Sequence, residues 1–314
     1  MYHPYFRGKQ FELLAVRETA TLMANSGFVP IIEPVKESLG GLKKALESIC
    51  AAGGQAIVIV NPYHGDLGGD GTGITELLQE AFAENEAISA GILLRGTTSI
   101  EDATDYYLAH QEHSPTFVHA GFLAQKALAN YLGADLPGSR HVFLEDQANT
   151  LYRKHFNGST RALVRDGFKR RKNSEYALIS IEHFSELHLT YNDPLGMQGF
   201  GDFLTVGDNF SEGGGPAYAV AIHLTFIDPD KEDEMFIYHF VSTSNDTPTD
   251  PAGKFAEALN GLIEKLESGN SKLLETNAIK EFRSLHEKQH FPGLGYVKKL
   301  SMKHHIETLA AYLG

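Results

Sequence analysis

The sequence predicts an α/β protein built as an eight-stranded TIM-like barrel, in which each parallel strand is followed by a helix. Three observations lead to this fold class. Short apolar runs alternate with amphipathic segments at intervals of about 20 to 35 residues. The apolar runs are hydrophobic at almost every position, as expected of strands that are buried on both faces. The 314 residues also suffice for one barrel of about 250 residues with additions at its ends. An open, doubly wound parallel sheet is the alternative, because it uses the same repeat.

The first elements are a helix and then a strand. Residues 10–24 place apolar side chains such as Phe11 at helical spacing, and Gly27 ends the helix. Residues 28–35 form a short β-branched run that contains Glu33 near its end, and a helix-like segment follows. This pair is the first strand-to-helix unit of the predicted barrel.

The same unit recurs along the chain. Ser99 and Asp102 form a capping signature at the start of one of its helices. The predicted strands that follow the first one lie at residues 55–66, 90–96, 115–122, 140–146, 160–168, 202–207 and 217–227. The run at 217–227 is the eighth and would close the barrel.

The pattern changes after the eighth predicted strand. Residues 228–233 are rich in turn formers, and residues 234–241 alternate like the antiparallel partner of a hairpin. A polar linker at 244–253 leads to amphipathic helices. The sequence therefore predicts a barrel domain with an N-terminal helix at 1–245 and a helical extension, packed on the barrel, at 250–314.

The amino-acid composition excludes several classes of function. Hydrophobic residues make up 42% of the chain and charged residues 21%, which is ordinary for a soluble globular protein. The formal net charge of −13 argues against broad nucleic-acid binding. A single cysteine, Cys50, excludes an internal disulfide and a cysteine-rich zinc site. The charged N-terminus and the lack of a long apolar run predict a cytoplasmic protein that does not insert into a membrane.

Polar side chains close most of the predicted strands, where barrel enzymes collect their active-site residues. Each of them also has a structural explanation, because loops and helix caps begin at the same positions. Arg95 and His119 lie inside apolar runs, so each needs a partner, and carboxylates of neighbouring strands are the expected ones. The predicted catalytic residues are His119 for proton transfer and Glu33, Glu145 and Asp166, which would orient it or hold Mg²⁺ or Mn²⁺.

The remaining strand-end residues suit the binding of an anion. Guanidinium groups bind phosphate in bidentate fashion, so arginines at the barrel end predict a small anionic ligand that carries phosphate. The expected ligand-binding residues are Arg95, Arg165, Asn61, Asp202, His223 and Arg170. This interpretation makes the protein a barrel enzyme, for example a hydrolase.

Two further features of the sequence are less specific indicators of function. Six basic residues lie within the twelve from Arg161 to Lys172, and they form either a solvated loop or a local contact for RNA or DNA. The glycine-rich segments at 65–73 and 211–217 could bring backbone N–H groups to an anion or could simply form turns. Neither segment has the spacing of a Walker or Rossmann motif.

Several segments carry a family resemblance: PYFRGKQFELLAVRE, VPIIEPVKE, RDGFKRRKN, GFGDF and GGPAYAVAIHLTFIDP. With them the chain resembles, over nearly its whole length, an uncharacterised bacterial family related to the phage Beta protein family. The resemblance implies a barrel-like fold, a role in phage conflict and a small nuclease-like protein partner. It implies no catalytic motif. The alternative function is therefore a non-catalytic subunit that docks this partner through the C-terminal helices and the hairpin.

The resemblance marks a set of signature positions, to which it assigns no roles. These positions are Arg7, Lys9, Glu12, Glu33, Arg165, Asp166, Gly201, Asp202 and His223.

Overall fold

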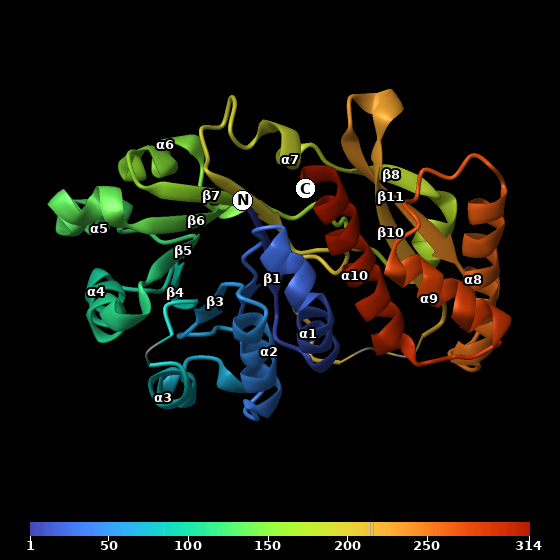
Figure 1. Cartoon of the computed structure of the whole chain (residues 1–314), viewed down its shortest axis with the longest axis horizontal. Coiled ribbons are helices and arrows are strands. Elements are labelled where there is room, and N and C mark those ends of the chain that lie inside the picture. Colours follow the sequence, from blue (N-terminus) through green and yellow to red (C-terminus); the bar gives the residue numbers. More distant parts are fainter. Residues whose placement is uncertain (84, 214, 216) are drawn as a thin grey trace. The chain divides into compact units, whose positions relative to one another are not determined.

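The computed structural model describes residues 1–314 except residues 84, 214 and 216 (Figure 1). The chain divides into two compact units. Unit 1 comprises Met1–Arg165 and Leu187–Phe203, and unit 2 comprises Asp166–Glu186 and Leu204–Gly314. Unit 1 is thus interrupted by a short segment that belongs to unit 2.

Unit 1 is a closed barrel of eight parallel strands, as the sequence predicts. In order around the barrel, the strands are β1 (Tyr2–Phe6), β2 (Ile31–Ile32), β3 (Ala56–Ile59), β4 (Ile88–Arg95), β5 (Thr116–Ala120), β6 (Arg140–Leu144), β7 (Thr160–Arg165) and β9 (Gly199–Asp202). The barrel closes because β1 pairs with β2 on one side and with β9 on the other. Closure rules out the doubly wound open sheet.

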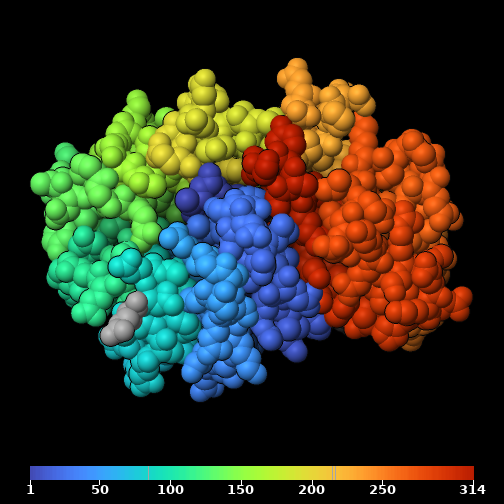
Figure 2. All heavy atoms as spheres, viewed as in Figure 1, coloured from blue at the N-terminus to red at the C-terminus, as the bar shows by residue number. Residues whose placement is uncertain are grey.

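Helices follow the strands in chain order around unit 1, and their colours run from blue through cyan and green to yellow in Figure 1. The same colours mark these residues on the space-filling surface in Figure 2. They are α1 (Gln10–Asn25), α2 (Gly40–Ala51), α3 (Thr72–Ala81), α4 (Ile100–Ala109), α5 (Gln125–Leu132), α6 (Thr150–Arg153) and α7 (Leu187–Thr190). Short 3-10 helices are η1 (Gly65–Leu67), η2 (Gln111–His113), η3 (Gly133–Gly138), η4 (Glu145–Gln147) and η5 (Lys154–Phe156). The capping box at the start of α4 is confirmed, since Ser99 Oγ accepts from Asp102 N and Asp102 Oδ2 accepts from Ser99 N.

One face of the barrel strands forms a shared apolar core. Its members are Tyr5, Val29, Ile31, Ile57, Ile59, Leu93, Val118, Ala120, Val142, Leu144, Ala162, Val164 and Phe203. Side chains alternate between the two faces of a strand. A strand residue next to a member of this core therefore points to the outer face, and this decides which polar residues can share a site.

The prediction that residues 217–227 close the barrel is wrong. That run forms β10 (Ala221–Asp228), which pairs antiparallel with β11 (Glu234–Val241), so the predicted hairpin is confirmed. β11 also pairs with β8 (Ile181–Ser185), and the three strands form a separate sheet. The barrel strand that the sequence did not predict is β1, which is five residues long and contains a proline.

Unit 2 packs its C-terminal helices on this three-stranded sheet. The helices are α8 (Pro251–Glu267), α9 (Asn277–Glu287) and α10 (Leu294–Leu313), and two 3-10 helices, η6 (Asn173–Leu178) and η7 (Pro229–Lys231), complete the unit. Apolar residues of β10 such as Leu224 form one core with residues of the helices such as Phe255 and Phe282. The predicted boundary near residue 245 does not coincide with the observed division, because the hairpin belongs with the helices.

Candidate functional site

The candidate site lies at the carboxyl end of the barrel and centres on Glu33, which follows β2 and is completely buried. Alternation places Glu33 on the same face as Ile31, a member of the barrel core. One carboxylate oxygen accepts from Tyr5 Oη at 3.0 Å and forms an ion pair with Arg7 Nη1. Both donors come from β1 or directly follow it, so barrel closure brings them to Glu33.

The second carboxylate oxygen of Glu33 holds the start of the loop after β3. It accepts from the backbone N–H groups of Tyr63 and His64 at 3.0 and 3.1 Å, and His64 Nδ1 lies 2.9 Å from it. Burial acts to raise the pKa of Glu33, but the hydrogen bond from His64 and the charge of Arg7 outweigh it and lower the pKa to about 2. Glu33 is thus ionised at neutral pH. A carboxylate only accepts hydrogen bonds, so His64 carries a proton on Nδ1.

Arg95 ends β4 and lies beside the same loop. Alternation from Leu93, a core residue, places Arg95 on the inner face of the barrel. Its Cζ atom is 3.4 Å from the centroid of the Tyr63 ring, a cation–π contact, and Tyr63 is 52% exposed. The His64 ring lies 5.0 Å from the same ring in an edge-on arrangement. Tyr63 therefore brings Arg95 and His64 together.

No carboxylate pairs with the Arg95 guanidinium among the residues that the structure describes. The expectation of a carboxylate partner for this arginine is wrong, because an aromatic ring takes that place. A ring contact leaves the N–H donors of the guanidinium for other acceptors.

His119 lies elsewhere in unit 1. Its neighbours Val118 and Ala120 belong to the barrel core, so His119 points to the outer face of β5, where it is fully buried. Its Nδ1 atom lies 2.7 Å from Tyr152 Oη and its Nε2 atom 2.9 Å from His141 Nδ1. The predicted carboxylate partners are thus wrong for His119 too, and its place on the outer face separates it from Glu33.

Burial and the neighbouring His141 lower the pKa of His119 well below its usual value. His119 is therefore a neutral side chain of the layer between strands and helices.

Arg165 and Glu145 meet, but not on the inner face. Val164 belongs to the barrel core, so Arg165 at the end of β7 points outward. Its guanidinium binds the Glu145 carboxylate through Nε and through Nη2, the latter at 3.0 Å from Oε1. Each side chain is 24% exposed. This bidentate pair joins β7 to η4.

Asn61 and Asp202 have local roles in the barrel. The Asn61 side chain donates to the Leu93 carbonyl at 3.0 Å and accepts from the Leu93 N–H at 2.7 Å, which extends the pairing of β3 with β4. Asp202 is buried and accepts from Tyr2 Oη at 2.8 Å. Since its neighbour Phe203 is a core residue, Asp202 faces outward.

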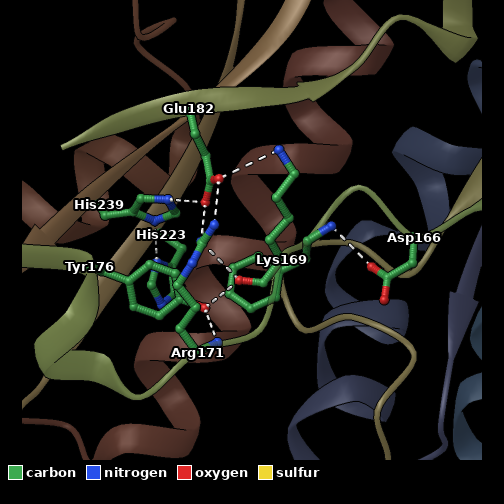
Figure 3. A network of polar contacts seen from close by, with 8 residues as sticks. Asp166, Lys169, Arg171, Tyr176, Glu182, His223 and His239 are labelled. Carbon is green, nitrogen blue, oxygen red and sulfur yellow. Dashed lines mark hydrogen bonds and ion pairs between the residues drawn. The ribbon is translucent and has the colours of Figure 1, made fainter. Parts of the chain in front are cut away.

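Three predicted site residues belong to unit 2, and two of them, Asp166 and His223, are labelled in Figure 3. Asp166 accepts from the backbone N–H groups of Phe168 and Asp208 at 3.0 and 2.8 Å. Arg170 donates to the Asn209 carbonyl at 2.7 Å. His223 contacts His239 through their Nδ1 atoms. The single group of ten residues that the strand ends suggested is therefore not assembled on the inner face of the barrel.

The predicted catalytic and ligand-binding residues do not include Tyr5, Arg7, Tyr63 and His64, of which Arg7 is expected only as a signature position and His64 only as a strand-end residue. Tyr5 and Arg7 were missed because β1 was not recognised as a strand. The signal was present in the alternation of Tyr2, Pro4 and Phe6 with the polar His3 and Arg7.

The described residues offer no set of three or more His, Cys, Asp or Glu side chains arranged to hold a metal ion. Glu33, the expected ligand for Mg²⁺ or Mn²⁺, is instead surrounded by hydrogen-bond donors and Arg7. Within the same part of the chain, no helix combines the length and apolar character that crossing a membrane requires.

Comparisons with protein-family models, with curated proteins and with solved structures gave no match. The resemblance to the phage Beta protein family, the nuclease-like partner and the role in phage conflict therefore stay predictions.

Proposed function

We propose that the carboxyl end of the barrel binds a small anionic ligand of the phosphate-bearing class, with Arg95 as its central contact. The observation that carries this proposal is the position of the Arg95 guanidinium on the half-exposed Tyr63 ring, with no ion pair among the described residues. Guanidinium groups bind phosphate and carboxylate through paired N–H donors, which the ring contact does not use.

Glu33 and His64 supply the chemistry next to this anion. A buried, ionised carboxylate that accepts from Nδ1 fixes the orientation and the tautomer of an imidazole. His64 thus takes the proton-transfer role that the sequence suggested for His119. Hydrolysis of a phosphate ester is the reaction that we assign to this arrangement.

Calorimetric titration with inorganic phosphate, pyrophosphate and nucleotides tests the binding step. Arg95→Gln removes the charge and keeps a polar side chain, so we expect the affinity to fall by about 10- to 100-fold. Arg17→Gln is the matched control, because Arg17 is exposed on α1. Equal affinities for the Arg95→Gln variant and the wild type would contradict the proposal, as would a wild type that binds none of these anions.

Turnover of a chromogenic phosphate ester tests the chemical step separately. His64→Gln should leave phosphate affinity within about threefold of the wild type and lower turnover by at least about 100-fold. Retained turnover would remove His64 from the proposal without affecting the role of Arg95.

A further inference from the structure

A second polar network lies in unit 2 around Glu182 on β8 (Figure 3). Arg171 binds this carboxylate through both terminal nitrogens, at 2.6 and 3.1 Å. His239 Nε2 on β11 lies 3.0 Å from Oε1, and Lys169 Nζ lies 3.6 Å from Oε2. The carboxylate is 12% exposed and the His239 side chain is completely buried. Two residues of the basic run, Lys169 and Arg171, thus contact the same largely buried carboxylate.

A second histidine extends this network. His223 on β10 is the direct cross-strand partner of His239, and their Nδ1 atoms are 2.7 Å apart. Glu182 only accepts, so His239 carries a proton on Nε2 and, when neutral, has a lone pair on Nδ1. His223 must then donate from its own Nδ1. The hydrogen-bond direction from His223 through His239 to Glu182 is fixed.

The facing Nδ1 atoms can hold one proton between them. Two protonated rings would direct two N–H groups at each other, and both would be cations. One extra proton on His239 would place a third cation at Glu182, beside Arg171 and Lys169. Burial, His239 and Lys298 lower the pKa of His223 well below its usual value. Burial also lowers the pKa of His239, although Glu182 acts to raise it.

The segment after Asp166 covers this pair. The Tyr176 ring of η6 lies 4.7 Å from the His223 ring and 4.5 Å from the His239 ring. Its hydroxyl accepts from Arg171 N and donates to the Lys169 carbonyl. The charged and titratable groups around the pair are therefore Glu182 of β8, Arg171 and Lys169 of the covering segment, Tyr176 of η6 and Lys298 of α10. Only one of these groups, Glu182, is an acid that is ionised at neutral pH.

We propose that the His223–His239 pair is a pH-sensitive latch that holds residues 169–178 on the three-stranded sheet of unit 2. While both rings are neutral, Tyr176 packs on them and Arg171 binds Glu182. Opening of the segment removes the Tyr176 ring and the Arg171 charge, so the imidazoles become hydrated and accept protons. Acid therefore favours the open form and exposes the Arg171 side chain, which is 25% exposed in the closed form.

Hydrogen–deuterium exchange of the full chain, followed by mass spectrometry from about pH 7.5 to about pH 5, tests the latch. After correction for the intrinsic exchange rate, protection of residues 169–178 should fall by up to about tenfold per pH unit for each proton taken up. Peptides from β5 and from β11 are the internal reference and should lose less protection. Equal loss in all peptides, or constant protection of residues 169–178, would overturn the proposal.

The His239→Gln variant distinguishes opening of the latch from acid unfolding of the whole protein. The glutamine amide can donate to Glu182 and accept from His223, but it takes up no proton in this range. We expect the pH dependence of protection of residues 169–178 to weaken in this variant, because only His223 is left to take up a proton on opening. His290→Gln, at an exposed position of unit 2, should behave as the wild type.

The tautomers provide a test that needs no variant. Nitrogen-15 NMR of the wild-type imidazoles at neutral pH should show His223 protonated on Nδ1 and His239 on Nε2. The opposite assignment for either ring would refute the hydrogen-bond direction on which the latch depends.

Discussion

The Nε2 atom of His119 lies 2.9 Å from the Nδ1 atom of His141, and the hydrogen bonds through this pair run in one direction. Ser139 Oγ donates to the Leu136 carbonyl at 2.6 Å, so it accepts from His141 Nε2 at 2.7 Å. His141 Nδ1 then accepts from His119, whose own Nδ1 accepts from the Tyr152 hydroxyl. Both imidazoles are neutral, and the chain of hydrogen bonds links β5 and β6 to the helical layer.

Acid should destabilise unit 1 through this pair. Burial, with a contribution from Arg161, lowers the pKa of His141 to about 3 in the folded protein, whereas an unfolded histidine titrates near 6.5. The unfolded state therefore binds more protons as the pH falls below about 6.5, and the folded state loses stability down to about pH 3. Each such histidine contributes a slope of up to about 1.4 kcal/mol per pH unit.

Urea denaturation at about pH 7 and about pH 5.5 measures this effect. The free energy of unfolding should be lower at the second pH, and the difference should shrink in His141→Gln. Identical denaturation midpoints at the two pH values would show that these histidines do not titrate on unfolding.

His119→Ala should reduce stability and leave ligand binding unchanged. The substitution opens a cavity among aromatic rings and leaves the Tyr152 hydroxyl without its acceptor. We expect a loss of about 2 to 4 kcal/mol in the free energy of unfolding. Phosphate affinity of the folded variant, measured by calorimetry at low temperature, should match the wild type. A large loss of affinity with full stability would return His119 to the site.

Glu33→Gln should be strongly destabilising. It removes the Glu33 carboxylate from the buried Arg7 guanidinium, and removing one member of a buried ion pair costs about 3 to 5 kcal/mol. Thermal unfolding should show the loss, and Glu47→Gln on the exposed face of α2 should show none.

The contribution of Glu33 to the stability of the folded protein should also depend on pH. Because the pKa of Glu33 is lowered to about 2 in the folded state, its contribution to stability is present above about pH 4.5 and is lost as the pH falls through 2. The Glu33→Gln variant should lack this component of acid denaturation. The same acid dependence in variant and wild type would contradict the assignment.

Gly71→Ala should disrupt the loop that carries Tyr63 and His64. An added Cβ atom would lie 1.6 Å from the Val60 carbonyl oxygen, so the backbone would have to move. We expect a stability loss of more than about 2 kcal/mol. Gly73→Ala, two residues later, meets only Leu39 Cδ1 at 3.7 Å and lies in α3, where alanine is favourable. Equal stability of the two variants would show that the loop tolerates displacement. The close approach of the Val60 carbonyl therefore explains why position 71 is a glycine.

Part of the candidate site could be predicted from the sequence. Glu33 and Arg95 each end a recognisable apolar run, and a barrel collects its functional residues at such ends. Their position on the inner face could not be separated from the outward position of His119, because a shift of one residue reverses the face of a strand side chain. The aromatic partner of Arg95 comes from a loop whose path depends on glycines and on the Glu33 carboxylate.

Local periodicity and turn chemistry are enough to specify the repeating strand and helix units, the capping box at Ser99 and the hairpin of β10 and β11. The choice of the segment that closes the barrel depends on long-range strand pairing. Both Tyr2–Phe6 and Ala221–Asp228 can form a strand, but closure depends on pairing partners far away in the chain. The same pairing delivers Tyr5 and Arg7 to Glu33, and no local pattern contains that information.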